Sequence, residues 1–190
     1  MDTTTYLERR RHLRRAVPTG AILLVANQHA SRNYADNLYP FRQDSHMLYY
    51  TGLTEPDLAL LIDDEGRETL YGSPPHPDEL IWSGPHPELE DHAAAAGIAG
   101  HADIERLAEA LGALRRRGAA IHHLPPYRAD RTLTLSRLLD VGPDQVGGGA
   151  SDELVRAVVE QRSVKTAAEV AEIEEALGVT AEMYRAAMAA

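Results

Sequence analysis

Short apolar runs in the first half of the chain predict the strands of a sheet. Residues 21–26 form a continuous apolar run bounded by Gly and Asn, which is typical of a strand buried on both faces. We expect further strands at 47–51, 58–62 and 68–71. The acidic stretch with a glycine at 63–66 is a turn signal, so the last two strands should form a hairpin.

The remaining pattern is mostly helical, because apolar side chains recur every three or four residues. The helix over 103–117 is the clearest, since Asp103 can cap its start and Gly118 follows its end. Helices are predicted at 3–17, 87–96, 103–117, 132–139, 152–162 and 166–189, a further strand at 119–124, and a glycine-rich loop at 142–149. About five strands and six helices indicate an α/β fold with a mostly central, mixed sheet flanked by helices.

The segment 32–56 has a different character, because its rings and charges follow neither a helical nor a strand period in its first half. It contains the only phenylalanine of the chain and several tyrosines, interleaved with charged side chains. We expect an ordered loop that leads into a strand. The side chains expected to structure this loop are Arg32, Tyr39, Arg42 and Asp44, with a charge-assisted bond fixing the last two.

Composition and charge exclude several classes of protein. The formal net charge of −10 argues against a nucleic-acid partner, because phosphate binding requires clustered Lys and Arg. There is no cysteine, no apolar run of membrane-spanning length and no signal peptide. These features predict a soluble, cytoplasmic protein without a membrane partner.

Histidine and arginine offer few candidates for chemistry. His122 and His123 are adjacent on a predicted strand, so they point to opposite faces and cannot bind one ion together. The other histidines have no ligand spacing, and no metal site is expected. The arginines at positions 9–15 are interpreted as a solvated helix face.

Several motifs together resemble the N-terminal domain of aminopeptidase P, the Xaa-Pro aminopeptidases, within the creatinase/aminopeptidase P N-terminal domain family. The matching motifs are Tyr6-x-x-Arg9-Arg10-Arg11, Arg32 with Asp36, the block from Tyr39 to Ser45, the block from Tyr49 to Pro56, Ile81-Trp82-x-Gly84, and Arg162-Ser163-Val164-Lys165-x-x-x-Glu169. They cover nearly the whole chain in the family's order. Prolidase and creatinase have related N-terminal domains and remain an alternative assignment.

The resemblance implies a six-stranded mixed sheet in one part of a two-domain enzyme that removes an N-terminal residue preceding proline. In that family two metal ions, usually manganese, are held by a C-terminal pita-bread domain, and none of its ligands falls in this sequence. The implied division is an N-terminal domain at 1–162, followed at 163–190 by a linker and the first helix of a truncated catalytic domain. The implied partners are that catalytic domain, a proline-containing peptide and further copies in a dimer or tetramer.

By resemblance, two residues lie at the rim of the substrate cleft and none is catalytic. Asp36 would reach toward the active site, and Trp82 would contribute to a neighbouring subunit's substrate pocket. The alternatives are an ion pair of Asp36 with Arg32 or Arg42, and packing of Trp82 in a core or an interface.

Two other functions remain open on the sequence. An independent hydrolase would use Asp36, Asp44 and His46, although no nucleophile motif accompanies them. A stand-alone interaction module would bind a peptide or a protein through the aromatic loop.

Overall fold

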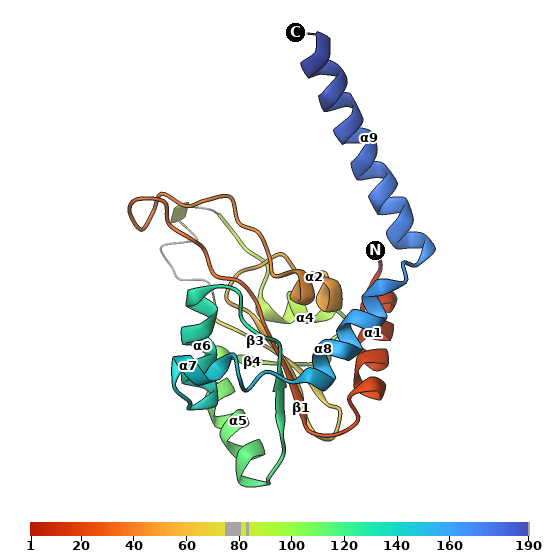
Figure 1. Ribbon diagram of the computed structural model, residues 1–190. Coiled ribbons are helices and arrows are strands. Elements are labelled where there is room, and N and C mark those ends of the chain that lie inside the picture. The colour runs from red at the N-terminus through yellow and green to blue at the C-terminus, as the bar shows by residue number, and fades with distance from the viewer. Residues whose placement is uncertain (75–80, 83, 190) are drawn as a thin grey trace.

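The computed structural model describes residues 1–74, 81–82 and 84–189, and its centre is a five-stranded sheet (Figure 1). The strands are β1 (Ala21–Val25), β2 (Ala59–Ile62), β3 (Glu68–Gly72), β4 (Gly100–Asp103) and β5 (Ile121–His123). Their order is β4-β3-β2-β1-β5; β2 is antiparallel to both neighbours, while β4 pairs parallel with β3 and β5 parallel with β1. All strands except β2 therefore run in the same direction and end at the same edge of the sheet.

Helices cover both faces of the sheet. The first face packs against α1 (Thr3–Ala16), α2 (Ser45–Thr51), α4 (Leu89–Ala95) and α8 (Asp152–Ser163). The second packs against α5 (Leu107–Arg116), α6 (Ala129–Leu139) and α7 (Pro143–Val146). Along β1, Ile22 and Leu24 join the first core, and Ala21 and Leu23 join the second. This two-sided burial explains why β1 is continuously apolar and confirms the α/β fold expected from the sequence.

The strand predicted at 47–51 is wrong, because these residues form α2. Asp44 caps the helix by accepting from the backbone N–H groups of His46 and Met47, and Gly52 ends it in the left-handed region at φ 73°. Met47, Tyr50 and Thr51 are buried at a spacing of three and four residues. The tertiary burial of one helical face outweighs the β-propensity of the tyrosines and the threonine.

Other differences are smaller. β4 was not predicted. The strand is short, its residues are alternately exposed, and few of them are apolar, so the sequence does not mark it as a strand. The helix predicted from Asp103 begins with a 3-10 turn, η1 (Ile104–Arg106), and α6 begins three residues earlier than expected. Part of the glycine-rich stretch forms α7. The connection between β3 and α4 lies partly outside the described residues.

Two arginines of α1 differ from the solvated face that the sequence suggested, whereas Arg11 and Arg15 are exposed as expected. Arg9 and Arg10 are buried. The Arg10 guanidinium donates to a Glu68 carboxylate oxygen at 2.8 Å, to the Tyr50 carbonyl at 2.9 Å and to the Gly97 carbonyl at 3.1 Å. One side chain thus joins α1 to β3, to α2 and to the turn after α4.

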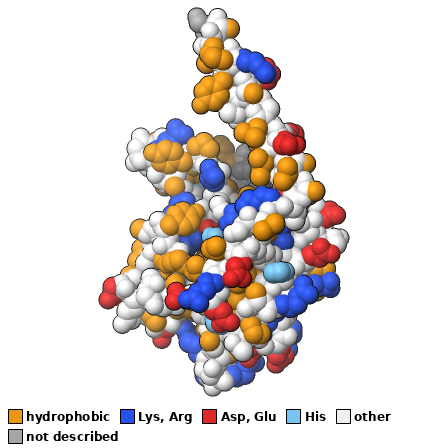
Figure 2. Space-filling model, turned by 45° about the vertical axis from the view of Figure 1, so that its right-hand side comes forward, with side chains coloured by type: hydrophobic (Ala, Val, Ile, Leu, Met, Phe, Trp, Pro, Cys, Tyr) orange, Lys and Arg blue, Asp and Glu red, His pale blue; other side chains and the backbone are white. Residues whose placement is uncertain are grey.

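The last helix, α9 (Ala167–Ala189), projects away from the body of the molecule (Figure 1). It runs for 23 residues without interruption, and none of them is buried. Large apolar side chains lie exposed along it: Val170, Ile173, Leu177, Val179, Met183, Tyr184 and Met188. Figure 2 shows such side chains on the projecting helix. Among the described residues, no helix is both long and apolar enough to cross a membrane.

Candidate functional site

The long connection between β1 and β2 starts and ends at the edge where most strands finish. It extends outward as a loop, returns through α2 and re-enters the sheet at β2 (Figure 1). It includes the whole segment 32–56 that was singled out in the sequence. Its base, its helix and its tip have different environments.

The base of the connection is fixed by a buried amide pair. The Asn27 backbone N–H donates to the Gln43 side-chain oxygen at 3.0 Å, and the Asn27 side-chain amide donates to the Arg42 carbonyl at 2.9 Å. Gln43 in turn donates to the Glu55 carbonyl at 2.6 Å. Asn27 and Gln43 are only 4% and 6% exposed. Their hydrogen bonds therefore satisfy backbone groups of the connection that water does not reach.

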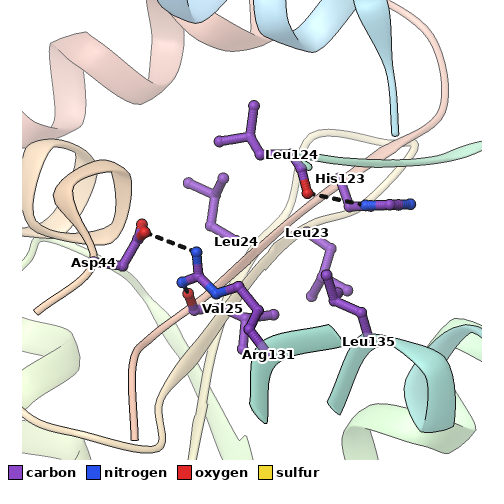
Figure 3. A pocket seen from close by; sticks show the side chains of 8 residues that line it. All are labelled: Leu23, Leu24, Val25, Asp44, His123, Leu124, Arg131 and Leu135. Carbon is purple, nitrogen blue, oxygen red and sulfur yellow. Dashed lines mark hydrogen bonds and ion pairs between the residues drawn. The ribbon is translucent and has the colours of Figure 1, made fainter. Parts of the chain in front are cut away.

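Beside this pair lies a buried ion pair between Asp44 and Arg131 (Figure 3). Arg131 Nη1 lies 2.7 Å from Asp44 Oδ2, and Arg131 Nη2 donates to the Val25 carbonyl at the end of β1. The space lined by these side chains is about 10 Å³, roughly the room for a single water molecule. The ion pair therefore joins α6, α2 and β1 in a structural role, and the space beside it is too small for a substrate.

The half-buried side of α2 carries a second cluster of charges and rings. The Arg9 guanidinium lies 3.8 Å from the centre of the Tyr49 ring, and that of Arg162 lies 5.2 Å from the same centre. Arg162 Nη1 also lies 3.1 Å from His46 Nδ1, so it donates to an unprotonated ring nitrogen. Burial lowers the pKa of His46, and the cationic Arg162 and Arg131 lower it further against the opposing effect of Asp44.

The tip of the connection is a tight ladder with exposed side chains. The Arg32 N–H donates to the Asn37 carbonyl at 2.8 Å, and the Tyr39 N–H donates to the Ala30 carbonyl at 2.9 Å. The Arg32 guanidinium lies 5.0 Å from the Tyr39 ring centre. Asp36 lies exposed within this ladder and makes no ion pair with any described residue, so its carboxylate faces solvent.

The contacts of the other sequence candidates differ from those anticipated. Arg42 is exposed and anchors the loop through its carbonyl group, while the partner of Asp44 is Arg131. Trp82 is 88% exposed, which places it outside the core. Asn27, Gln43 and Arg131 were not anticipated from the sequence. A separation of 87 residues between Asp44 and Arg131 left no local signal for their ion pair.

The arrangement does not assemble the acid, base and nucleophile of a hydrolase. Asp44 is buried in its ion pair, His46 accepts from Arg162, and Asp36 lies exposed at the loop tip. Within the described part of the chain, no three His, Asp or Glu side chains are placed to hold a metal ion. The exposed groups at the loop tip and at Trp82 are suited to contacts with another surface.

A family model and individual relatives match this chain to the same kind of protein. Residues 6–122 match the family model described as "Aminopeptidase P, N-terminal domain". The chain is 28% identical over 136 residues to an Xaa-Pro aminopeptidase of Haemophilus influenzae, covering 66% of this chain and 31% of the relative. It is 38% identical over 66 residues to a probable Xaa-Pro aminopeptidase of Emericella nidulans, covering 34% of this chain and 14% of the relative.

The fold has a match among solved structures. The low-pH form of Escherichia coli aminopeptidase P superimposes with a TM-score of 0.61 at 22% identity, covering 74% of this chain and 33% of that one. The chain thus spans about a third of the length of the bacterial proteins it matches.

Proposed function

Because this chain belongs to the aminopeptidase P N-terminal domain family, we propose that it is the non-catalytic N-terminal part of an Xaa-Pro aminopeptidase. Such an enzyme removes the residue that precedes proline at a peptide's N-terminus. The two manganese ions that the family implies do not fit this part: no described cluster offers three ligands. No chemical step is therefore assigned to these residues.

The proposed division is a domain at 1–162 followed at 163–190 by a linker and the first helix of the catalytic domain. The observation that carries it is the contrast between α8, whose Leu154, Ala157 and Val158 are buried, and α9, which buries nothing. Exposed apolar side chains along α9 require a covering surface. A catalytic domain in the same chain supplies one.

Asp36 and Trp82 are proposed as rim residues that face the substrate cleft, either of the same chain or of a neighbouring copy in a dimer or tetramer. A carboxylate without a cationic partner suits the free ammonium of a peptide. An exposed indole offers a rigid apolar face to the proline ring. The ladder at the loop tip holds Asp36 in place, which makes recognition less costly in entropy.

The test uses the full-length gene product and peptides of the form Xaa-Pro-Xaa. Asp36→Asn should raise KM several-fold with little effect on kcat, and Asp36→Glu should restore part of the loss. Trp82→Ala should likewise raise KM several-fold with little effect on kcat, whereas Trp82→Phe should have kinetics close to those of the wild type. Asp140→Asn, a control on the exposed end of α6, should match the wild type. Unchanged kinetics in both rim variants would reject the rim assignment.

A direct assay separates the proposal from a hydrolase formed by this chain alone. The 190-residue chain should not cleave Xaa-Pro peptides with or without added manganese. Robust turnover that survives repeated purification and disappears in His46→Gln would favour the hydrolase and overturn the proposal.

A stand-alone interaction module is the second candidate, favoured by the exposed rings of the loop tip. Tyr34 and Tyr39 are 62% and 55% exposed. A coding sequence that ends at Ala190, together with a concentration-dependent dimer that Tyr34→Ser and Tyr39→Ser disrupt, would favour this candidate. A downstream catalytic domain in the same reading frame would favour the first.

A further inference from the structure

A second and larger pocket lies at the strand-end edge of the sheet. Its volume is about 260 Å³. Four segments at strand ends contribute to it: 25–28 from the last residue of β1 onward, 57–59 up to the first residue of β2, Ser73 after β3 and Ile104 after β4. In α/β proteins, the crevice outside the carboxyl ends of the strands is where ligands commonly bind.

Most of the surface that lines this pocket is apolar, and polar residues contribute the rest. Leu58, Leu107 and Leu138 are among the apolar lining residues, and Gln28, Asp57, Ser73 and Thr134 are among the polar ones. A buried apolar cavity of about 150 Å³ accepts benzene in another protein. The pocket therefore has room for one ring with a short substituent.

The frame of the pocket is held by buried bonds. The Asp57 N–H donates to the Asn27 carbonyl at 3.1 Å, and Asn27 is itself fixed by Gln43. Asp57 adopts φ 58°, a left-handed conformation that costs energy in a residue other than glycine. Arg131, which also lines the pocket, is held by Asp44. A lining whose residues are fixed in this way favours a preformed site over one created by the ligand.

The charges of the lining leave one carboxylate without a counterion. Arg131 is neutralised by Asp44, and Asp130 lies 2.9 Å from an Arg128 nitrogen. Asp57 is exposed and makes no ion pair within the described part of the chain. A ligand that enters this pocket therefore encounters apolar walls and one unmatched negative charge.

We propose that this pocket binds a small organic cation: a primary amine attached to an apolar group the size of one ring. The apolar group occupies the space between α6 and the strand ends, and the ammonium group lies against the Asp57 carboxylate. This site is independent of the proposed function, because it uses neither Asp36 nor Trp82 nor a second domain.

The test is an NMR titration of the 190-residue chain with benzylamine and with benzyl alcohol, its neutral analogue of similar shape. Benzylamine should shift the amide signals around Asn27, Asp57 and Thr134. It should bind about two- to fivefold more tightly than the alcohol, which is the effect of one solvent-exposed ion pair. Binding that is equal for the two compounds would overturn the assignment of a cation.

Matched variants locate the site. Asp57→Asn keeps a residue that tolerates the left-handed conformation and should reduce benzylamine binding to the level of the alcohol. Asp140→Asn is its control, since Asp140 has φ 54° but does not line the pocket. No effect of Asp57→Asn would overturn the proposal.

Filling the pocket should abolish binding of both compounds. Thr134→Phe on α6 does so with little expected loss of stability, because the threonine hydroxyl bonds only its own helix at the Asp130 carbonyl. Thr132→Phe is the control, as Thr132 bonds its helix in the same way and does not line the pocket. Ser73→Phe, at an exposed position, provides a second filling variant if the first fails to fold. Benzylamine binding that persists in a folded filling variant would place the amine elsewhere and reject the site.

Discussion

Arg10 illustrates how much of this fold depends on single buried charges. It is fully buried on α1, and burial lowers its pKa while the carboxylate of Glu68 opposes that effect. Its three acceptors lie on β3, on α2 and in the turn after α4. Since removing one partner of a buried ion pair leaves the other uncompensated, the position should be intolerant of truncation.

We expect Arg10→Ala to lower the free energy of unfolding by about 3–5 kcal/mol, because it leaves a carboxylate and two carbonyl groups without their donor. Urea denaturation followed by circular dichroism measures this change. Arg11→Ala, at the exposed neighbouring position, should stay within about 0.5 kcal/mol of the wild type. Similar losses at both positions would contradict the role assigned to Arg10.

Asp44 has two separable tasks, as a helix cap and as the partner of Arg131. Asp44→Asn keeps an acceptor for the cap but removes the charge, and should cost about 3 kcal/mol or more. Asp44→Ala should cost about 1 kcal/mol beyond that, because the cap is lost as well. Denaturant midpoints of the two variants measure the difference. Asp36→Asn, on the exposed loop, serves as the control, and an Asp44→Asn variant as stable as the wild type would refute the ion-pair role.

At the scale of elements, sequence patterns correctly predicted the strands and turns that are marked by their own residues. The continuous apolar run at 21–26 and the turn at 63–66 led correctly to β1 and to the β2–β3 hairpin. Residues 47–51 were assigned to a strand because Tyr and Thr favour strands, whereas burial of one face decides the structure. The site residues that come from distant elements, such as Arg131, have no local signal at all.

The contact between α2 and α8 should make stability depend on pH. His46 accepts from Arg162, and its pKa in the folded state is lowered. The unfolded chain then takes up the proton more readily than the folded chain. The stabilising contribution of neutral His46 is therefore fully present above the ordinary histidine pKa of about 6.5, and it is lost as the pH drops below that value. Urea midpoints measured between pH ~7.5 and ~5.5 should decline, and His46→Gln should reduce the decline. His12→Gln, at an exposed position on α1, should retain the wild-type slope.

At the scale of the whole molecule, a packed body carries a helix that contributes little to it. The contacts of α9 with the body lie at its base, where Glu169 is 3.3 Å from Arg9 and Glu172 is 3.7 Å from the N-terminal amine. Beyond this base the helix depends on its own propensity, without the tertiary packing that stabilises most helices in proteins.

A chain ending at residue 163 should therefore unfold cooperatively at nearly the same urea concentration as the 190-residue chain. In the longer chain, amide hydrogen exchange should be fast beyond residue 175 and slow in α8, because only α8 is buried. Strong protection along α9 in a dilute monomer would contradict this division of the molecule.

The link between α8 and α9 has a chemical consequence for handling the protein. Lys165 is the only lysine in the sequence and lies exposed between the two helices, beside a Val164 that is 78% exposed. A lysine-specific endoprotease therefore has one target in the whole chain, at the proposed boundary between domains. A single cut would release α9 and leave the folded body intact. Amine-reactive labels would likewise attach only at this link and at the N-terminus.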